Sequence, residues 1–135
     1  MTKIEELTNE QLDVLVAEKV LEWTLIRCTS GGNTVVGFDE EARRSRLVCP
    51  PEDWSGQSVF RPSTDIACAF QVVEKMRMNG YRFVLWNTLD TTTAQFSETP
   101  PGRPWGWGAI YGNESLTASR AISIAALKAC GIEEV

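Results

Sequence analysis

The sequence predicts an α+β fold, with helices packed against a mostly antiparallel sheet in the order α-β-β-α-β-β-β-α. Three capped segments have apolar residues at helical spacing, and each of the first two is followed by short β-rich runs. These runs are joined by turns too short to hold a crossover helix, which favours antiparallel pairing. The 135 residues fit one domain, 1–135, with an irregular insertion at about 39–62.

The first predicted helix covers residues 9–22 and has a well-defined start. Thr8 is expected to cap it, with Gln11 at the third helical position, and Leu7 and Leu12 hold the two hydrophobic staple positions. An apolar stripe follows on one face, which predicts that this face is buried.

Two strands are expected next, over residues 23–28 and 34–38, because both runs are rich in β-branched and aromatic residues. The residues between them, Ser-Gly-Gly-Asn at 30–33, are typical of a turn. Residues 39–62 contain three prolines and no clean periodicity, so we expect an irregular insertion there, either functional or mobile.

The second helix is expected to begin at Ser63 or Thr64, with Asp65 in its first turn, and to end at Gly80. Its predicted buried stripe is Ile66, Ala69, Phe70, Val73 and Met76. Strands are predicted over 81–86, 88–96 and 105–111, with a turn at 112–113.

The third helix is predicted over residues 118–130, capped near Thr117 and closed by Gly131. Leu127 and Ile132 are placed for the hydrophobic contact of a Schellman motif. The body of this helix is apolar on nearly all sides, so we expect it to be buried on more than one face.

Composition and charge exclude several classes of function. The net charge of −5 speaks against general nucleic-acid or membrane binding, and the absence of histidine removes every His-dependent catalytic or zinc site. Cys28, Cys49, Cys68 and Cys130 contain no C-x-x-C pair, so free thiols are favoured over a metal site. We expect no metal and no cofactor. The acidic N-terminus is unlike a signal peptide, and no apolar run is long enough to span a membrane, so the expected location is the host cytoplasm.

Several segments of the chain resemble a known family. Residues 63–76, the strand around Trp86, and residues 121–129 resemble the phage ABA sandwich domain proteins and, more distantly, the NinX-type phage proteins. The first helix is also similar to that family, whereas residues 29–62 are not. The resemblance implies a viral accessory protein with an α/β/α sandwich, and it supplies no catalytic residue.

A set of aromatic and arginine side chains on Pro/Gly-interrupted segments is the main candidate for a binding site. Indole rings stack on bases and guanidinium groups pair with phosphates, so this mixture suits a nucleotide. The expected ligand-binding residues are Trp54, Arg61, Arg103, Trp105, Trp107 and Arg120. The alternative is that the indoles fill a small core.

Two helix starts are further candidates for holding a phosphate, one at residues 63–65 and one at residues 115–120, because free amides at a helix start favour an anion. Ordinary helix capping explains the same residues, and Asp65 would repel an anion.

Two other clusters are weaker candidates. Arg43, Arg44 and Arg46 form a basic cluster that adjacent acids nearly cancel, which favours a solvated loop over nucleic-acid contact. Asp65 and two other acids, Asp90 and Glu114, fall near element ends, but no catalytic motif accompanies them.

We therefore expect a non-enzymatic phage accessory protein that sequesters a small host molecule, most plausibly a nucleotide second messenger of antiviral defence. The alternative is a protein–protein adaptor or inhibitor that docks on a host or phage enzyme, since exposed Trp and Arg also dominate protein interfaces. A homo-oligomer is expected because small proteins often complete a pocket across a symmetric interface.

Overall fold

A computed structural model describes residues 2–28, 34–50, 59–98 and 108–135. The first half of the chain forms η1 (Ile4–Glu6), α1 (Asn9–Leu15), η2 (Val16–Val20), β1 (Thr24–Cys28), β2 (Thr34–Asp39) and β3 (Arg44–Cys49). The second half forms α2 (Ile66–Met78), β4 (Tyr81–Asn87), β5 (Thr92–Glu98), β6 (Ile110–Ser115) and α3 (Ala118–Ala129).

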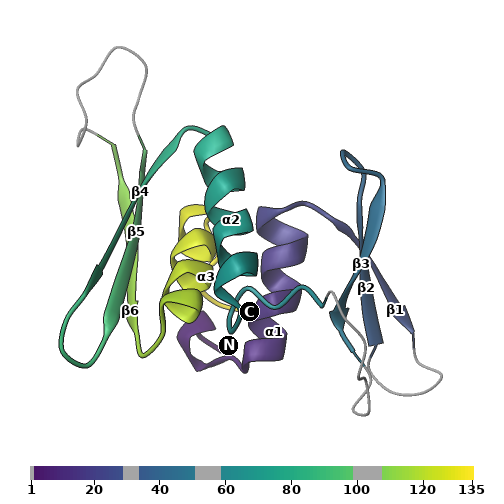
Figure 1. The fold of residues 1–135 in the computed structure, drawn as a ribbon, viewed down its shortest axis with the longest axis horizontal. Coiled ribbons are helices and arrows are strands. Elements are labelled where there is room, and N and C mark those ends of the chain that lie inside the picture. The colour runs from purple at the N-terminus through teal and green to yellow at the C-terminus, as the bar shows by residue number, and fades with distance from the viewer. Residues whose placement is uncertain (1, 29–33, 51–58, 99–107) are drawn as a thin grey trace.

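The helices form a central layer between two sheets (Figure 1). Within the described residues, the strands pair antiparallel in two three-stranded sheets, of order β1-β2-β3 and β4-β5-β6. Helix α3 packs on β5 and β6, α2 lies beside β4, and α1 contacts β3. The α+β class is thus confirmed. The strands form two sheets where one was expected, and the layer order is the reverse of the α/β/α arrangement that the resemblance implies.

The predicted helix caps are confirmed at α1 and α3. Thr8 and Gln11 form a reciprocal capping box, and Thr117 Oγ1 accepts a hydrogen bond from the Arg120 amide at 3.3 Å. At the end of α3, Gly131 has a φ of +84° and the Ile132 amide donates to the Leu127 carbonyl at 2.9 Å. These are local devices, and they form where the sequence places them.

The start of α2 differs from the expectation. The cap is Asp65, whose carboxylate accepts from the Ala67 amide at 2.9 Å, and not Ser63 or Thr64. Ser63 is buried, and its amide donates instead to the Asp13 carboxylate on α1 at 2.8 Å. The expected stripe on α2 is also partly wrong, because Ile66 and Phe70 are 46% and 44% exposed while Cys68 and Val72 are buried.

Two strands correct the sequence analysis. Residues 39–62 are not irregular throughout, because Arg44–Cys49 forms β3 against β2. Residues 112–113, expected to form a turn, lie within β6 and pair with β5. The strand expected over 105–111 begins, in the described residues, only at Ile110.

Phe60 closes the core between α1 and the β1–β3 sheet. Its side chain is fully buried, and its ring centroid lies 4.7 Å from that of Trp23. The Phe60 amide donates to the Leu47 carbonyl of β3 at 2.8 Å. On the other side of the helices, Phe96 of β5 is fully buried 5.1 Å from the Phe83 ring. The two sheets therefore share one continuous core, with the helices at its centre.

Candidate functional site

The predicted aromatic-arginine site is only partly within the described chain. Trp54, Arg103, Trp105 and Trp107 lie outside the described residues, so their convergence on a cavity stays a prediction. Of the predicted ligand-binding residues, Arg61 and Arg120 are described. Of the other tryptophans, Trp23 is buried in the core and Trp86 is 41% exposed on β4.

Arg61 lies just before α2, with an exposed side chain. Its carbonyl accepts hydrogen bonds from the Thr64 and Asp65 amides, at 3.1 and 2.7 Å. Its guanidinium acts on the buried Asp13 through charge, lowering the pKa of that carboxyl against the larger effect of burial. The backbone of Arg61 thus shapes the turn that leads into α2, and its side chain remains accessible to a partner.

Arg120 ties the N-terminal segment to α3. Its Nη1 donates to Asn9 Oδ1 at 2.7 Å, and its Nη2 donates to the carbonyls of Glu5 and Leu7 at 3.1 and 2.8 Å. The Arg120 guanidinium therefore already donates to three acceptors in the same chain, which fix its position. A ligand that bound this guanidinium would have to compete with those contacts.

Replacing Arg120 tests this tie. We expect Arg120→Ala to lower the free energy of unfolding by about 2 kcal/mol, because it removes charge-assisted hydrogen bonds from a half-buried group. Urea unfolding followed by tryptophan fluorescence measures the change. The control Arg77→Ala removes an exposed pair with Glu74, which should cost less than about 1 kcal/mol. Equal effects of the two substitutions would contradict the structural role.

The two predicted phosphate-binding helix starts come together at one end of the helical layer (Figure 1). Residues of both starts line a pocket of about 380 Å³, and Arg120 and Asn9 complete it. However, Asp65 and Thr117 each already accept a hydrogen bond from an amide in the first turn of their helix, those of Ala67 and Arg120. Capping therefore explains these residues without a ligand.

A groove of about 640 Å³ lies between α1 and the β1–β3 sheet, and we call it the α1 groove. Its apolar floor contains Leu7, Val14, Leu15 and Val35. The polar residues along it include Glu10, Gln11 and Glu18 from the helical side and Arg27 from β1. Its volume is in the range of ligand sites and is large enough for several side chains of a partner.

Charge in the α1 groove is weakly acidic. The lining of the groove holds two exposed carboxylates, Glu10 and Glu18, and one exposed guanidinium, Arg27. Glu18 also pairs with Lys19 beside the groove, at 3.4 Å. Burial raises the pKa of the Cys49 thiol in the wall, and the Glu10 charge raises it further. Cys49 is therefore a protonated thiol and a weak nucleophile at neutral pH. The groove suits an apolar or cationic occupant better than an anionic one.

The sequence analysis missed this groove. No site was predicted on the face of the first helix where Glu10, Val14 and Glu18 recur at intervals of four residues. The apolar Val14 on an otherwise charged face was the one available signal. The opposite wall comes from β2 and β3, and the sequence did not predict β3 at all.

The remaining candidates have structural partners. Arg46 donates to Gln71 Oε1 at 2.7 Å and lies 5.2 Å from the Phe60 ring centroid, so it braces α2 against β3 and is not part of a solvated loop. Asp65 is the cap of α2. The described residues contain no group of three or more His, Cys, Asp or Glu that could hold a metal ion. No helix among them is both long and apolar enough to cross a bilayer.

The fold defines a small α+β sandwich protein with an open groove on one side of its helical layer. The model of one family, the phage ABA sandwich domain, matches residues 14–127. The chain belongs to this family and is accordingly a phage accessory protein. The match includes residues 29–62, which the sequence comparison had left outside the resemblance. No curated protein matches the chain.

Proposed function

We propose that this phage protein is a non-enzymatic adaptor or inhibitor that binds a host or phage protein through the α1 groove, in the host cytoplasm. The observation that carries the proposal is the combination of apolar side chains and the Glu10 and Glu18 carboxylates in the lining of the α1 groove. The partner segment would place apolar side chains on Val14 and Leu15, and lysine or arginine beside Glu10 and Glu18. Opposite charges at the rim steer association, and burial of the apolar contacts supplies affinity.

Photo-cross-linking in infected host cells tests the proposal. A photoreactive amino acid replaces Gln11, which is exposed in the groove, or, as a control, Ala42, which is exposed at the far end of the β2–β3 hairpin. Because Gln11 also accepts from the Thr8 amide in the capping box, a thermal melt first establishes that the position-11 variant is folded. We expect a protein adduct from position 11 and none from position 42. Mass spectrometry then identifies the linked peptide, which should combine apolar residues with lysine or arginine. The absence of a protein adduct at position 11 would overturn the proposal.

Charge substitutions test the chemistry of the same groove. A synthetic, dye-labelled version of the cross-linked peptide is titrated with the purified protein, and binding is followed by fluorescence anisotropy. We expect Glu10→Gln with Glu18→Gln to weaken binding about fivefold, because two exposed pairs are lost. The control Glu40→Gln with Glu41→Gln removes the same charge at the far end of the hairpin and should leave binding unchanged. Equal effects of the two double variants would refute recognition at the rim.

A nucleotide ligand held by the predicted aromatic-arginine set is the second candidate, because indole rings stack on bases and the described member Arg61 has an exposed guanidinium. A thermal melt against ATP, GTP, NAD and cyclic dinucleotides tests it, since a ligand of the native state raises the midpoint. A midpoint shift that Trp105→Ala or Arg103→Ala abolishes would favour sequestration over the adaptor. No shift at millimolar concentration of any of these compounds would leave the adaptor.

A further inference from the structure

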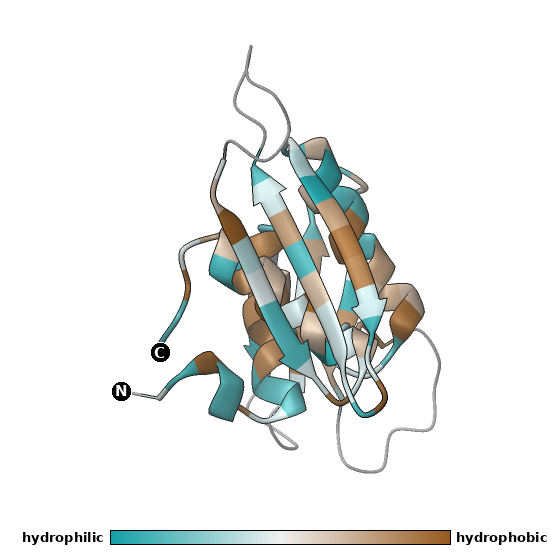
Figure 2. Cartoon of the chain, turned by 90° about the vertical axis from the view of Figure 1, so that its left-hand side faces the viewer, coloured by the Kyte–Doolittle hydropathy of each residue, from teal (hydrophilic) through white to brown (hydrophobic). Residues whose placement is uncertain are grey.

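Strand β4 is an exposed edge with few of the features that protect edges from pairing. Among the described residues, it is an end strand of the β4-β5-β6 sheet and pairs with β5 over seven residues without a register shift. Its sequence, Tyr-Arg-Phe-Val-Leu-Trp-Asn, holds no proline and no lysine. The opposite edge, β6, is largely polar from Gly112 to Ser115. Figure 2 shows the hydrophobic band along the centre of β4 and the uncovered outer face of the sheet. Natural proteins rarely leave such an edge free.

The direction of the free peptide groups on β4 follows from one hydrogen bond. The Glu98 amide at the end of β5 donates to Ala109 next to β6, at 3.0 Å. Alternate residues of a strand direct their peptide groups to opposite neighbours, so Ser97, Gln95 and Thr93 bond to β4. Their partners in β4 are Arg82, Val84 and Trp86. The peptide groups that face outward are therefore those of Tyr81, Phe83, Leu85 and Asn87.

The geometry points to a homodimer in which β4 of one copy pairs antiparallel with β4 of a second copy. The two-fold axis passes through Val84, so Phe83 of each copy pairs with Leu85 of the other and Tyr81 pairs with Asn87. In this register every outward peptide group of the strand finds a partner. The β4-β5-β6 sheets of the two copies then join into one continuous sheet. The inference concerns the β4 edge and is independent of the α1 groove.

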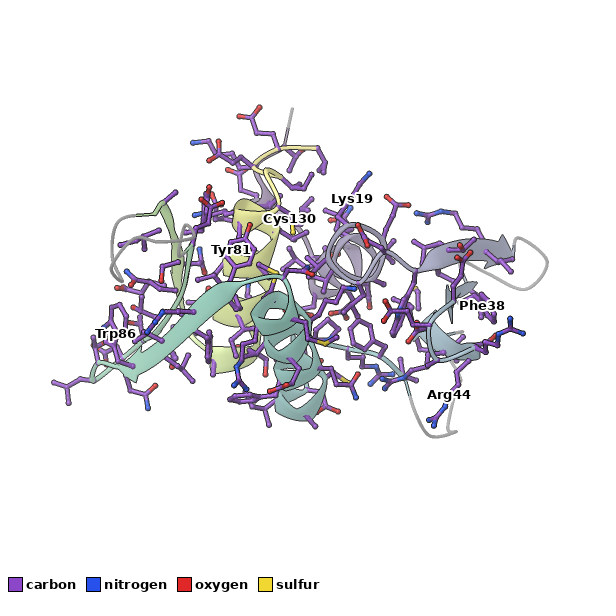
Figure 3. All side chains as sticks on the ribbon, turned by 90° about the horizontal axis from the view of Figure 1, so that it is seen from above. Lys19, Phe38, Arg44, Tyr81, Trp86 and Cys130 are labelled. Atoms are coloured by element: carbon purple, nitrogen blue, oxygen red, sulfur yellow. The ribbon has the colours of Figure 1, made fainter. Side chains whose placement is uncertain are left out.

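With this two-fold axis, side chains of β4 in one copy lie next to compatible side chains of β4 in the other copy. On the outer face, Val84 meets Val84 of the second copy, and the apolar stem of Arg82 lies beside the Trp86 ring of the second copy. Val84 and Trp86 are 39% and 41% exposed. Figure 3 shows Trp86 on the side of the sheet away from the helices, whereas Tyr81 points toward them. The pairing would cover the edge-facing side of both exposed apolar side chains.

Helix α2 extends the same surface on the inner side. Phe70 is 44% exposed and meets the Phe83 ring edge-on at 6.1 Å. A groove of about 510 Å³ beside Phe70 and Val84 joins α2 to the edge of β4. Extending the sheet past β4 brings α2 of a second copy next to this groove, with its own Phe70 at the same level. A second copy therefore covers the strand edge and the apolar helix face together.

The test uses the oligomeric state of the full chain by light scattering with size-exclusion chromatography. We expect the wild-type protein at twice its chain mass of 15.0 kDa. Val84→Lys places two like charges at the two-fold axis and should raise the dimer dissociation constant at least about tenfold. The matched control Ile110→Lys puts the same charge on an exposed apolar residue of the other edge strand and should leave the dimer intact. Thermal melts establish that both variants remain folded.

A cross-link fixes the register. Residues opposite each other in a non-hydrogen-bonded antiparallel pair have Cα atoms about 4.5 Å apart, within disulfide range. Oxidised Val84→Cys should therefore run as a covalent dimer, above the level that wild-type protein with its exposed Cys130 gives, and Ile110→Cys should not. A wild-type monomer at high micromolar concentration, or a dimer broken by Ile110→Lys and not by Val84→Lys, would overturn the inference.

Discussion

Phe60→Ala is expected to lower the free energy of unfolding by about 4 kcal/mol, the range for a large buried aromatic cut to alanine. Phe60 is fully buried, packs on Trp23 and lies under the Arg46 guanidinium. The substitution leaves a cavity between α1 and the β1–β3 sheet, which the backbone cannot fill. Urea unfolding followed by tryptophan fluorescence measures the loss, and the expected loss is a large share of the stability of a domain of this size.

The control for Phe60 is Leu89→Ala. Leu89 is fully exposed in the turn between β4 and β5, so its truncation should change stability by less than about 0.5 kcal/mol. If Phe60→Ala behaved like Leu89→Ala, Phe60 would belong to a solvent-exposed insertion, and the packing of the β1–β3 sheet on α1 would be wrong.

The stability of the protein is expected to depend on pH through Asp13. Burial raises the pKa of this carboxyl from 3.8 to about 6, although the Ser63 amide and the Arg61 charge lower it. Above pH 3.8 the unfolded chain gives up this proton, while the folded protein keeps it until about pH 6. The contribution of Asp13 is therefore fully present below the lower value and is lost as the pH rises through the higher one, by about 3 kcal/mol in all.

The variant Asp13→Asn isolates this effect from that of the other carboxylates. The amide cannot ionise, and its oxygen still accepts from the Ser63 amide. The difference in unfolding free energy between Asp13→Asn and the wild type should move in favour of the variant by about 2 to 3 kcal/mol from pH 4 to pH 7. Urea unfolding at intervals of pH measures it. A difference that stays constant with pH would show that Asp13 titrates normally.

Local signals in the sequence predicted the helices well. The residues that begin and end helices act on backbone groups only a few positions away, so the nearby sequence is enough to predict them. They are Thr8 with Gln11, Thr117, Gly80 and Gly131. The hairpin of β4 and β5 was predicted for the same reason, because its two strands are close in the chain.

Long-range partners were out of reach of the same reasoning. Ser63 was expected to cap α2, but its amide bonds to Asp13, fifty residues away. Residues 44–49 have a mixed, arginine-rich pattern, and they form a strand because β2 and the α1 layer accept their alternate faces. Arg120 was predicted to bind a ligand, and its guanidinium contacts residues more than a hundred positions away.

The α1 groove could not be predicted for a related reason. A groove is a relation between surfaces, and its two walls come from α1 and from a sheet whose third strand was not expected. The sequence did indicate the class of the chain, since the phage sandwich resemblance is confirmed over residues 14–127.

The sequence by itself determined the caps of α1 and α3, the hairpin of β4 and β5 after α2, and the phage sandwich class. The tertiary structure decided the division into two sheets, the burial of Phe60 and Asp13, the α1 groove and the open β4 edge. The physical reason is the distance along the chain over which each interaction acts. Caps, turns and periodicity act between neighbours in the chain, whereas burial and cavities depend on which distant surfaces exclude water from each other.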